Sequence, residues 1–120
     1  MRPFRSFRVW REAHELTLAL YEATGSFPRN EQYGLTSQIR RSAASVCANL
    51  AEGCGRRTDA DFARFVQIAL GSASELEYHV LLAGDLKLLD AAQSTALDVS
   101  VTNVKRMLTG LARKLRANGG

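Results

Sequence analysis

The sequence predicts an all-α protein, an up-down-up-down antiparallel four-helix bundle. Apolar residues recur at helical spacing along most of the 120 residues, as in the series Leu97, Val101, Val104 and Leu108. Sustained strand-like alternation is missing, and no Asn-Gly or Asp-Gly turn joins two apolar runs. The four helical stretches are separated by roughly four to eight residues, and such short connections favour antiparallel neighbours. We therefore expect one domain, residues 1–120, with no internal repeat.

The first two helices are bounded by chain breakers. The first is expected over residues 8–24, because the segment Gly25-Ser26-Phe27-Pro28 follows it. The second is expected over residues 31–52, because Gly53 follows its last turn and glycine is the usual residue just after a helix.

The third and fourth helices carry capping signals. Thr58 is a plausible N-cap for the third helix, expected over residues 58–84. Asp90 and Gln93 have the spacing of a capping box, which predicts that the fourth helix covers residues 91–116.

The composition is that of an ordinary globular protein. Apolar residues make up 46% of the chain and charged residues 23%, with a net charge of +4. Uncharged runs such as residues 65–74 are too short to cross a membrane. The first twelve residues lack an apolar core followed by a small-residue cleavage site, so we expect no secretory signal, no membrane partner and a cytoplasmic location.

The sequence gives no support for catalysis or for a cofactor. Cys47 and Cys54 are seven residues apart, which in a helix separates them by roughly 10 Å, beyond disulfide reach. His14 and His79 form no ligand cluster with them, and we expect each to be a surface or interface residue. The segment from 53 to 58 lacks the spacing of a phosphate-binding loop. We expect no metal, no cofactor, no small-molecule substrate and no enzymatic activity.

Aromatic residues at helical spacings are more often part of a core than of a binding surface. On this basis Trp10, Phe62, Phe65 and Tyr78 are expected in the core. Tyr33, in the connection between the first two helices, is expected to be freer.

The second and third helices have unusually neutral outer faces. No charged residue lies between Arg41 and Glu52, or between Arg64 and Glu75. Since a surface helix normally keeps charges on its outer face, we expect these faces to pack against another subunit. The alternative is an ordinary surface rich in alanine, a good helix former. The predicted interface residues are Gln38, Arg40, Arg41, Ala44, Ser45, Ala48, Asn49, Glu52, Gly71, Ser72 and Glu75.

Two roles are open for the arginines of this set. Arg40 and Arg41 would line a channel and contact a polyanion, or they would pair with Glu52 or Glu75 of a neighbouring subunit. The fork geometry of the guanidinium group favours the pairing.

Basic residues gather in segments that an up-down-up-down bundle brings to one end. The start of the first helix, the connection between the second and third, and the end of the fourth share this end. Clustered cations bind phosphate backbones without reading sequence, although the same residues also suit an ordinary solvated face. The predicted nucleic-acid-binding residues are Arg2, Arg5, Arg8, Arg56, Arg57, Arg113, Lys114 and Arg116.

The order of residues in VWREAHELTLALYEATGSFPRNEQYGLTSQIRRSAASVCANLAEGCGR and FARFVQIALGSASELE resembles a known family. This four-helix bundle family includes the intervening-sequence proteins of bacterial large-subunit ribosomal RNA and is related to the accessory variability proteins of diversity-generating retroelements. The resemblance covers about residues 4–89. It rests on Trp10, Tyr21, Phe27-Pro28, Gly34-Leu35, Gln38, Arg40-Arg41, Asn49, Glu52-Gly53 and Gly71-Ser72, in this order.

The resemblance implies a left-handed bundle that assembles as a ring, a homopentamer with a central channel in known relatives. It also implies an association with nucleic acid, best supported for the retroelement relatives, which partner a reverse transcriptase. Ser42, Cys47 and Leu50 depart mildly from the common pattern without affecting the expected fold.

Two hypotheses follow for the function. The first is a non-catalytic, ring-forming bundle that binds RNA or DNA through a basic surface, as an accessory to a nucleic-acid enzyme such as a reverse transcriptase. The alternative is a protein-interaction scaffold with no nucleic-acid role.

Overall fold

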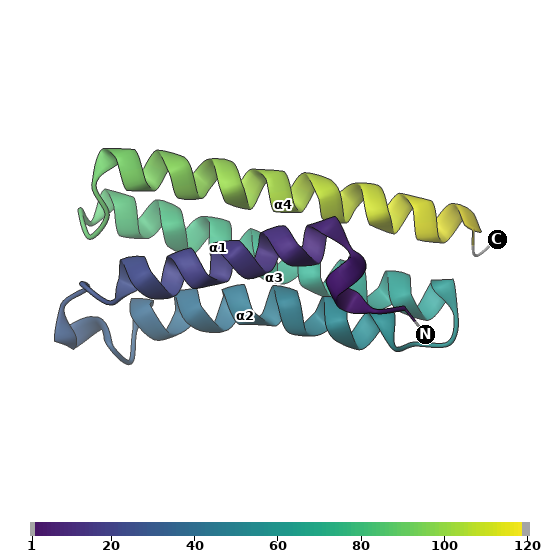
Figure 1. The fold of residues 1–120 in the computed structure, drawn as a ribbon. Helices are drawn as coiled ribbons and strands as arrows, with labels where there is room; N and C mark the ends of the chain where they lie inside the picture. The colour runs from purple at the N-terminus through teal and green to yellow at the C-terminus, as the bar shows by residue number, and fades with distance from the viewer. Residues whose placement is uncertain (1, 119–120) are drawn as a thin grey trace.

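The computed structural model describes residues 2–118 and contains four α-helices in that part of the chain, with no strand. The helices run antiparallel to their neighbours in an elongated bundle, with principal-axis extents of 47 × 22 × 20 Å (Figure 1). The all-α four-helix fold predicted from the sequence is therefore confirmed. The elements in chain order are the 3-10 turn η1 (Phe4–Ser6), α1 (Arg8–Thr24), the 3-10 turn η2 (Arg29–Glu31), α2 (Leu35–Cys54), α3 (Asp59–Asp85) and α4 (Ala91–Asn118).

The four helices share one apolar core. Each helix packs on its two neighbours, α1 on α2 and α4, and α3 on α2 and α4. The core side chains recur every three or four residues along each helix, which is the spacing that lines one face. The largest fully buried side chains include Leu20, Ile39, Leu50, Phe62, Val66, Leu76, Val101 and Leu108.

Helix α2 begins at Leu35, later than the predicted residue 31. The segment Arg29–Glu31 forms the separate 3-10 turn η2, and Gly34 precedes the helix with φ −110° and ψ −112°. The Glu31 carboxylate accepts a hydrogen bond of 3.2 Å from the Leu35 backbone N–H. Glu31 therefore satisfies a free donor of the first turn from outside the helix, whereas the sequence placed it inside.

The capping residues of α3 and α4 are in their predicted positions. The Thr58 hydroxyl accepts a hydrogen bond of 3.1 Å from the Asp61 N–H. Asp90 and Gln93 form the reciprocal capping box, with the Gln93 N–H donating to the Asp90 carboxylate at 2.8 Å and the Asp90 N–H to the Gln93 side chain at 3.2 Å. These bonds define the starts of both long helices.

A residue in the left-handed region follows the end of α3. Lys87 has φ 62°, and its N–H donates to the Gly84 carbonyl at 3.0 Å, while the Leu88 N–H donates to the Ala83 carbonyl at 2.9 Å. Glycine is the usual residue at such a position. A lysine there costs about 1 kcal/mol relative to glycine, because its Cβ crowds the backbone.

Two neighbouring residues of α3, Tyr78 and His79, differ from the prediction in their burial. Phe62 and Phe65 are buried as predicted, but Tyr78 is 57% exposed, so its assignment to the core is wrong. His79 is buried within the chain at 7% exposure and not at its surface. It lies seven residues after Ser72, on the side of α3 that packs against α2. His14 is exposed and stacks on Trp10.

Candidate nucleic-acid interface

One end of the bundle gathers three basic segments. Figure 1 shows the N-terminal segment, the α2–α3 connection and the last turns of α4 at this end. We call it the basic pole. It carries the residues predicted to bind nucleic acid, Arg2, Arg5, Arg8, Arg56, Arg57, Arg113, Lys114 and Arg116.

Arg2 acts within the fold. Its guanidinium group donates a hydrogen bond to the Asp59 carboxylate and lies over the Phe62 ring, 5.0 Å from the centroid. Its backbone N–H donates to the Cys54 carbonyl at 3.1 Å. Arg2 therefore fastens the N-terminal segment to the corner between α2 and α3, and Asp59 neutralises its charge.

Arg56 is also engaged inside the chain. Its guanidinium nitrogens lie 3.8 Å from Glu52 and 3.6 Å from Asp61, and the group stacks over the Phe65 ring at 4.6 Å. Arg64 shares two of these three partners, at 3.1 Å from the Asp61 carboxylate and 4.6 Å from the Phe65 centroid. Sequence reasoning did not include Arg64 in the pole, although it lies within the first two turns of α3 and is exposed.

Five of the eight predicted cations make no ion pair with residues 2–118. The Arg8 guanidinium group lies 3.8 Å from the carboxylate of Glu12, which is one helical turn further along α1, and this ion pair is exposed. The five unpaired cations are all exposed, and they come from all three segments of the pole. They are the groups available to an external polyanion. These residues are Arg5, Arg57, Arg113, Lys114 and Arg116.

Charge is segregated along the bundle. When each helix is divided at its middle residue, the half that contains the basic pole has twelve Lys and Arg against five Asp and Glu. The opposite half has four against seven. The modest overall charge of +4 therefore combines about +7 in one half with about −3 in the other.

The predicted subunit interface forms a polar groove between α2 and α3. The Ser45 and Ser72 hydroxyls are 2.9 Å apart across it, and the Asn49 amide donates to the Ser45 carbonyl at 2.8 Å. Arg41 and Glu75 both line the groove, and neither makes an ion pair in the described part of the chain. The groove has a volume of about 450 Å³ and is lined by Gln38, Arg41, Ser42, Ser45, Ser72 and Glu75.

Arg40 points to the other side of α2. Its guanidinium group donates to the Thr24 hydroxyl at 2.9 Å and to the Tyr21 carbonyl at 3.1 Å, and it lies over the Tyr21 ring at 4.6 Å. The side chain therefore satisfies a free carbonyl in the last turn of α1. This contact within the chain was not anticipated from the sequence, and a role for Arg40 between subunits stays a prediction.

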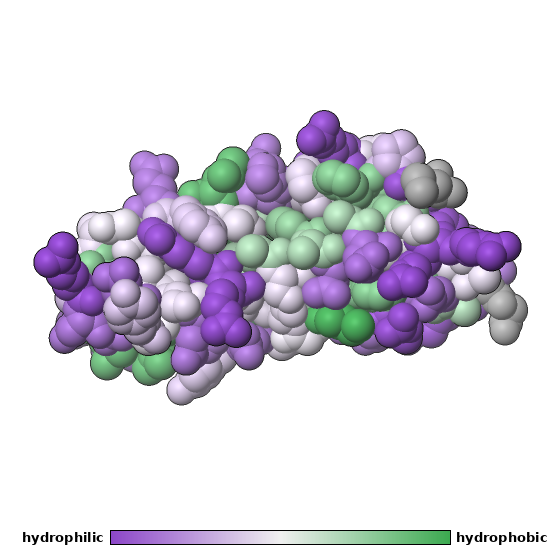
Figure 2. Space-filling model, turned by 90° about the horizontal axis from the view of Figure 1, so that it is seen from below, coloured by the Kyte–Doolittle hydropathy of each residue, from purple (hydrophilic) through white to green (hydrophobic). Residues whose placement is uncertain are grey.

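The α2 face beside the groove is smooth and weakly polar. Ala44 and Ala48 of α2 are exposed, as is Gly71 of the neighbouring helix α3. Figure 2, which views the bundle from the α2 side, shows a pale band of weakly hydrophobic surface between two strongly hydrophilic ends.

The sequence of this chain matches, over residues 5–110, the family described as 23S rRNA-intervening sequence protein. The chain belongs to this family. It is also similar to a crystal structure of a protein of unknown function from the S23 ribosomal protein family of Bacteroides thetaiotaomicron. The two share 26% identity with a TM-score of 0.76, over 87% of this chain and 97% of the other. No curated protein matches the chain.

This member of the 23S rRNA-intervening sequence family keeps one exposed glycine inside α3 that its own packing does not require. A Cβ atom built on Gly71 meets nothing within 4 Å. A glycine within a helix costs about 1 kcal/mol relative to alanine. No contact inside the described chain offsets that cost.

The two cysteine thiols of this family member are not activated. Burial raises the pKa of the Cys54 thiol, and it also raises the pKa of the Cys47 thiol despite the hydrogen bond between Cys47 and Thr17, so both thiols stay protonated at neutral pH. Residues 2–118 contain no cluster of three or more His, Cys, Asp and Glu suited to a metal ion. None of the described helices is long and apolar enough to cross a membrane.

Proposed function

We propose that the chain is a non-catalytic, homo-oligomeric bundle that binds RNA or DNA through its basic pole, as an accessory to a nucleic-acid enzyme such as a reverse transcriptase. The supporting observation is the set of five exposed, unpaired cations at one end of the molecule. Membership of a family named for a segment of ribosomal RNA agrees with this function.

The geometry of the pole suits phosphate backbones better than bases. Its cations lie on three separate segments at the tip of the bundle, an arrangement that suits contacts to phosphates, which position a protein without reading sequence. If five phosphates are contacted, raising salt from 50 to 200 mM weakens binding by about 100-fold for single strands and about 500-fold for duplex DNA.

In the assembly that we propose, neighbouring protomers pack through the α2–α3 face, which contains the polar groove and the exposed residues Ala44, Ala48 and Gly71. Its exposed small residues allow close approach, and its Arg41 and Glu75 side chains have complementary charges with no partner in the described chain. The family resemblance favours a homopentamer. Such a ring would repeat the basic pole five times and multiply its avidity for a long polyanion.

Reversing two pole charges tests the nucleic-acid proposal. Arg57→Glu with Lys114→Glu is expected to weaken binding of a 30-nucleotide RNA by about 30-fold at 50 mM salt, because two phosphate contacts are lost and repulsion is added. Both residues are exposed and unpaired, so the fold is unaffected. Arg56 is unsuitable, because its reversal would place a third carboxylate beside Glu52 and Asp61.

The matched control carries the same charge change at the other end. Arg29→Glu with Lys87→Glu is expected to weaken binding only a few-fold, through net charge alone. Fluorescence anisotropy with labelled RNA measures both variants. Equal losses, or no loss at the pole, would disprove binding there, and the protein-interaction scaffold would then become the favoured function.

A bulky residue in the α2–α3 face tests the assembly. Gly71→Leu is expected to reduce the solution mass to that of one chain, 13.2 kDa, because the added side chain fits this protomer but blocks close approach of another. Gly110→Leu is the control, since Gly110 is also open but lies on α4. Light scattering after size exclusion gives the masses; a wild-type monomer, or an intact Gly71→Leu assembly, contradicts the proposal.

A further inference from the structure

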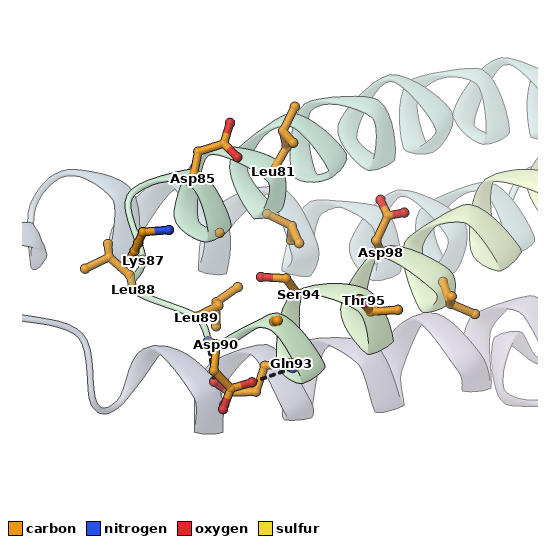
Figure 3. Close-up of a pocket in the computed structure, with 14 residues that line it drawn as sticks. Leu81, Asp85, Lys87, Leu88, Leu89, Asp90, Gln93, Ser94, Thr95 and Asp98 are labelled. Atoms are coloured by element: carbon orange, nitrogen blue, oxygen red, sulfur yellow. Dashed lines mark hydrogen bonds between the residues drawn. The ribbon is translucent and has the colours of Figure 1, made fainter.

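The end of the bundle opposite the basic pole contains a groove between α3 and α4. Figure 3 shows it between the last turns of α3, the α3–α4 connection and the first turns of α4. Its volume is about 850 Å³, within the range of ligand and peptide sites. Its apolar lining consists of Val80, Leu81, Leu88, Leu89 and Val99, together with the small residues Gly84 and Ala91.

Exposed apolar side chains concentrate at this end of the α3–α4 pair. Half of the eight large hydrophobic residues that are exposed in the described chain lie between 78 and 99. They are Tyr78, Leu81, Leu86 and Val99, each 53–58% exposed. Leu81 from α3 and Val99 from α4 both line the groove. Exposed apolar side chains that line a groove favour an interaction site there.

The rim of the groove is acidic. Asp85 projects from α3 and Asp98 from α4, on the two sides of the groove (Figure 3). Neither forms an ion pair with any residue from 2 to 118. Asp90 is occupied as the N-cap of α4, and Lys87 is the one cation in the lining. The apolar floor is thus bordered by two carboxylates that lack a counter-charge.

We propose that this groove binds a basic amphipathic helix of a partner protein. Apolar side chains of such a helix, spaced three or four residues apart, would pack on Leu81 and Val99. Lysine or arginine residues beside them would pair with Asp85 and Asp98, which supplies the missing counter-charge. Lys87, at the closed end of the groove, would meet the free carbonyls of the helix C-terminus and so set its direction.

Other occupants fit less well. Nucleic acid is repelled by the acidic rim. A second copy of this chain offers basic residues in the last turns of α4, but the apolar neighbours Leu108 and Leu115 are buried in its own core. The last turns of α4 in a second copy therefore do not present charges and apolar anchors together. The proposal uses the opposite end from the basic pole and does not rest on nucleic-acid binding.

Two synthetic peptides test the proposal with the full chain. Both have 14 residues and the same leucine pattern, with lysine at the polar positions of one and glutamate at those of the other. At 50 mM salt the lysine peptide is expected to bind and the glutamate peptide not. Asp85→Asn with Asp98→Asn is expected to weaken lysine-peptide binding about tenfold, and Leu81→Ser with Val99→Ser to abolish it, without unfolding, since these residues are exposed.

Matched controls separate groove binding from general charge attraction. Glu15→Gln with Glu22→Gln removes two exposed carboxylates from α1 and is expected to leave affinity unchanged. Equal losses in the two carboxylate variants, or full binding by the serine variant, overturn the proposal.

Two further measurements identify the occupant and separate the sites. A lower solution mass for Leu81→Ser with Val99→Ser would mean that a second copy fills the groove, which also overturns the proposal. The affinity for RNA is expected to be the same in the Asp85→Asn, Asp98→Asn variant as in the wild type. Loss of peptide binding at the groove and loss of RNA binding at the pole are thereby measured independently.

Discussion

Replacing Phe62 with alanine is expected to lower the free energy of unfolding by about 3–5 kcal/mol. The Phe62 ring is fully buried, meets Phe7 edge to face at 5.6 Å, and supports the Arg2 guanidinium group. Its removal leaves a cavity at the corner where α2, α3 and the N-terminal segment meet. Thermal unfolding followed by circular dichroism should show a Tm lower by about 10 °C or more.

The control for this prediction is another aromatic residue of the same helix. Tyr78→Ala is expected to change stability by no more than about 0.5 kcal/mol, because Tyr78 is exposed. Melts are compared at equal protein concentration, since assembly makes Tm depend on it. Similar losses for the two variants would contradict the packing described for the corner.

Replacing Gly53 with valine is expected to cost about 2–3 kcal/mol, the second-largest effect. A Cβ atom on Gly53 would lie 2.7 Å from Cδ1 of Phe62 and 2.9 Å from Cβ of Phe65. A valine could enter only if the end of α2 moved away from the start of α3. Urea titration measures the loss of stability as a lower midpoint.

The contact can be verified by coupling it to Phe62. In the Phe62→Ala background the valine is expected to cost less, because the ring that it would contact is gone, although Phe65 still restricts the space. Gly110→Val serves as the control, since the space around Gly110 is open. Additive costs for the Gly53 and Phe62 changes would show that the two residues do not share this contact.

Local signals made the helices predictable from the sequence. Thr58, Asp90 and Gln93 cap as expected, because a cap depends on residues only three apart. The start of α2 was placed too early, because a glutamate before a helix and one inside its first turn look alike in sequence. The difference depended on the backbone of Gly34.

Side-chain partners across the bundle were not predictable in the same way. Periodicity identifies a face of a helix but not what covers it, so Tyr78 and His79 were placed wrongly although they are neighbours. The sequence indicated which basic segments share an end. It could not show that Asp59 and Asp61 neutralise Arg2 and Arg56, because those pairs depend on distances across the α2–α3 corner. The groove between α3 and α4, with its acidic rim, was not predicted either, because it also depends on distances between helices.

The segregation of charge along the 47 Å axis gives the molecule a permanent electric dipole moment nearly parallel to its helices. Near a polyanion this dipole experiences a torque that turns the positive end forward before any contact forms. Encounters would then be pre-oriented at low ionic strength, and salt would slow association by screening both the torque and the attraction. The negative end would trail into the solvent, where its groove stays open to a second macromolecule.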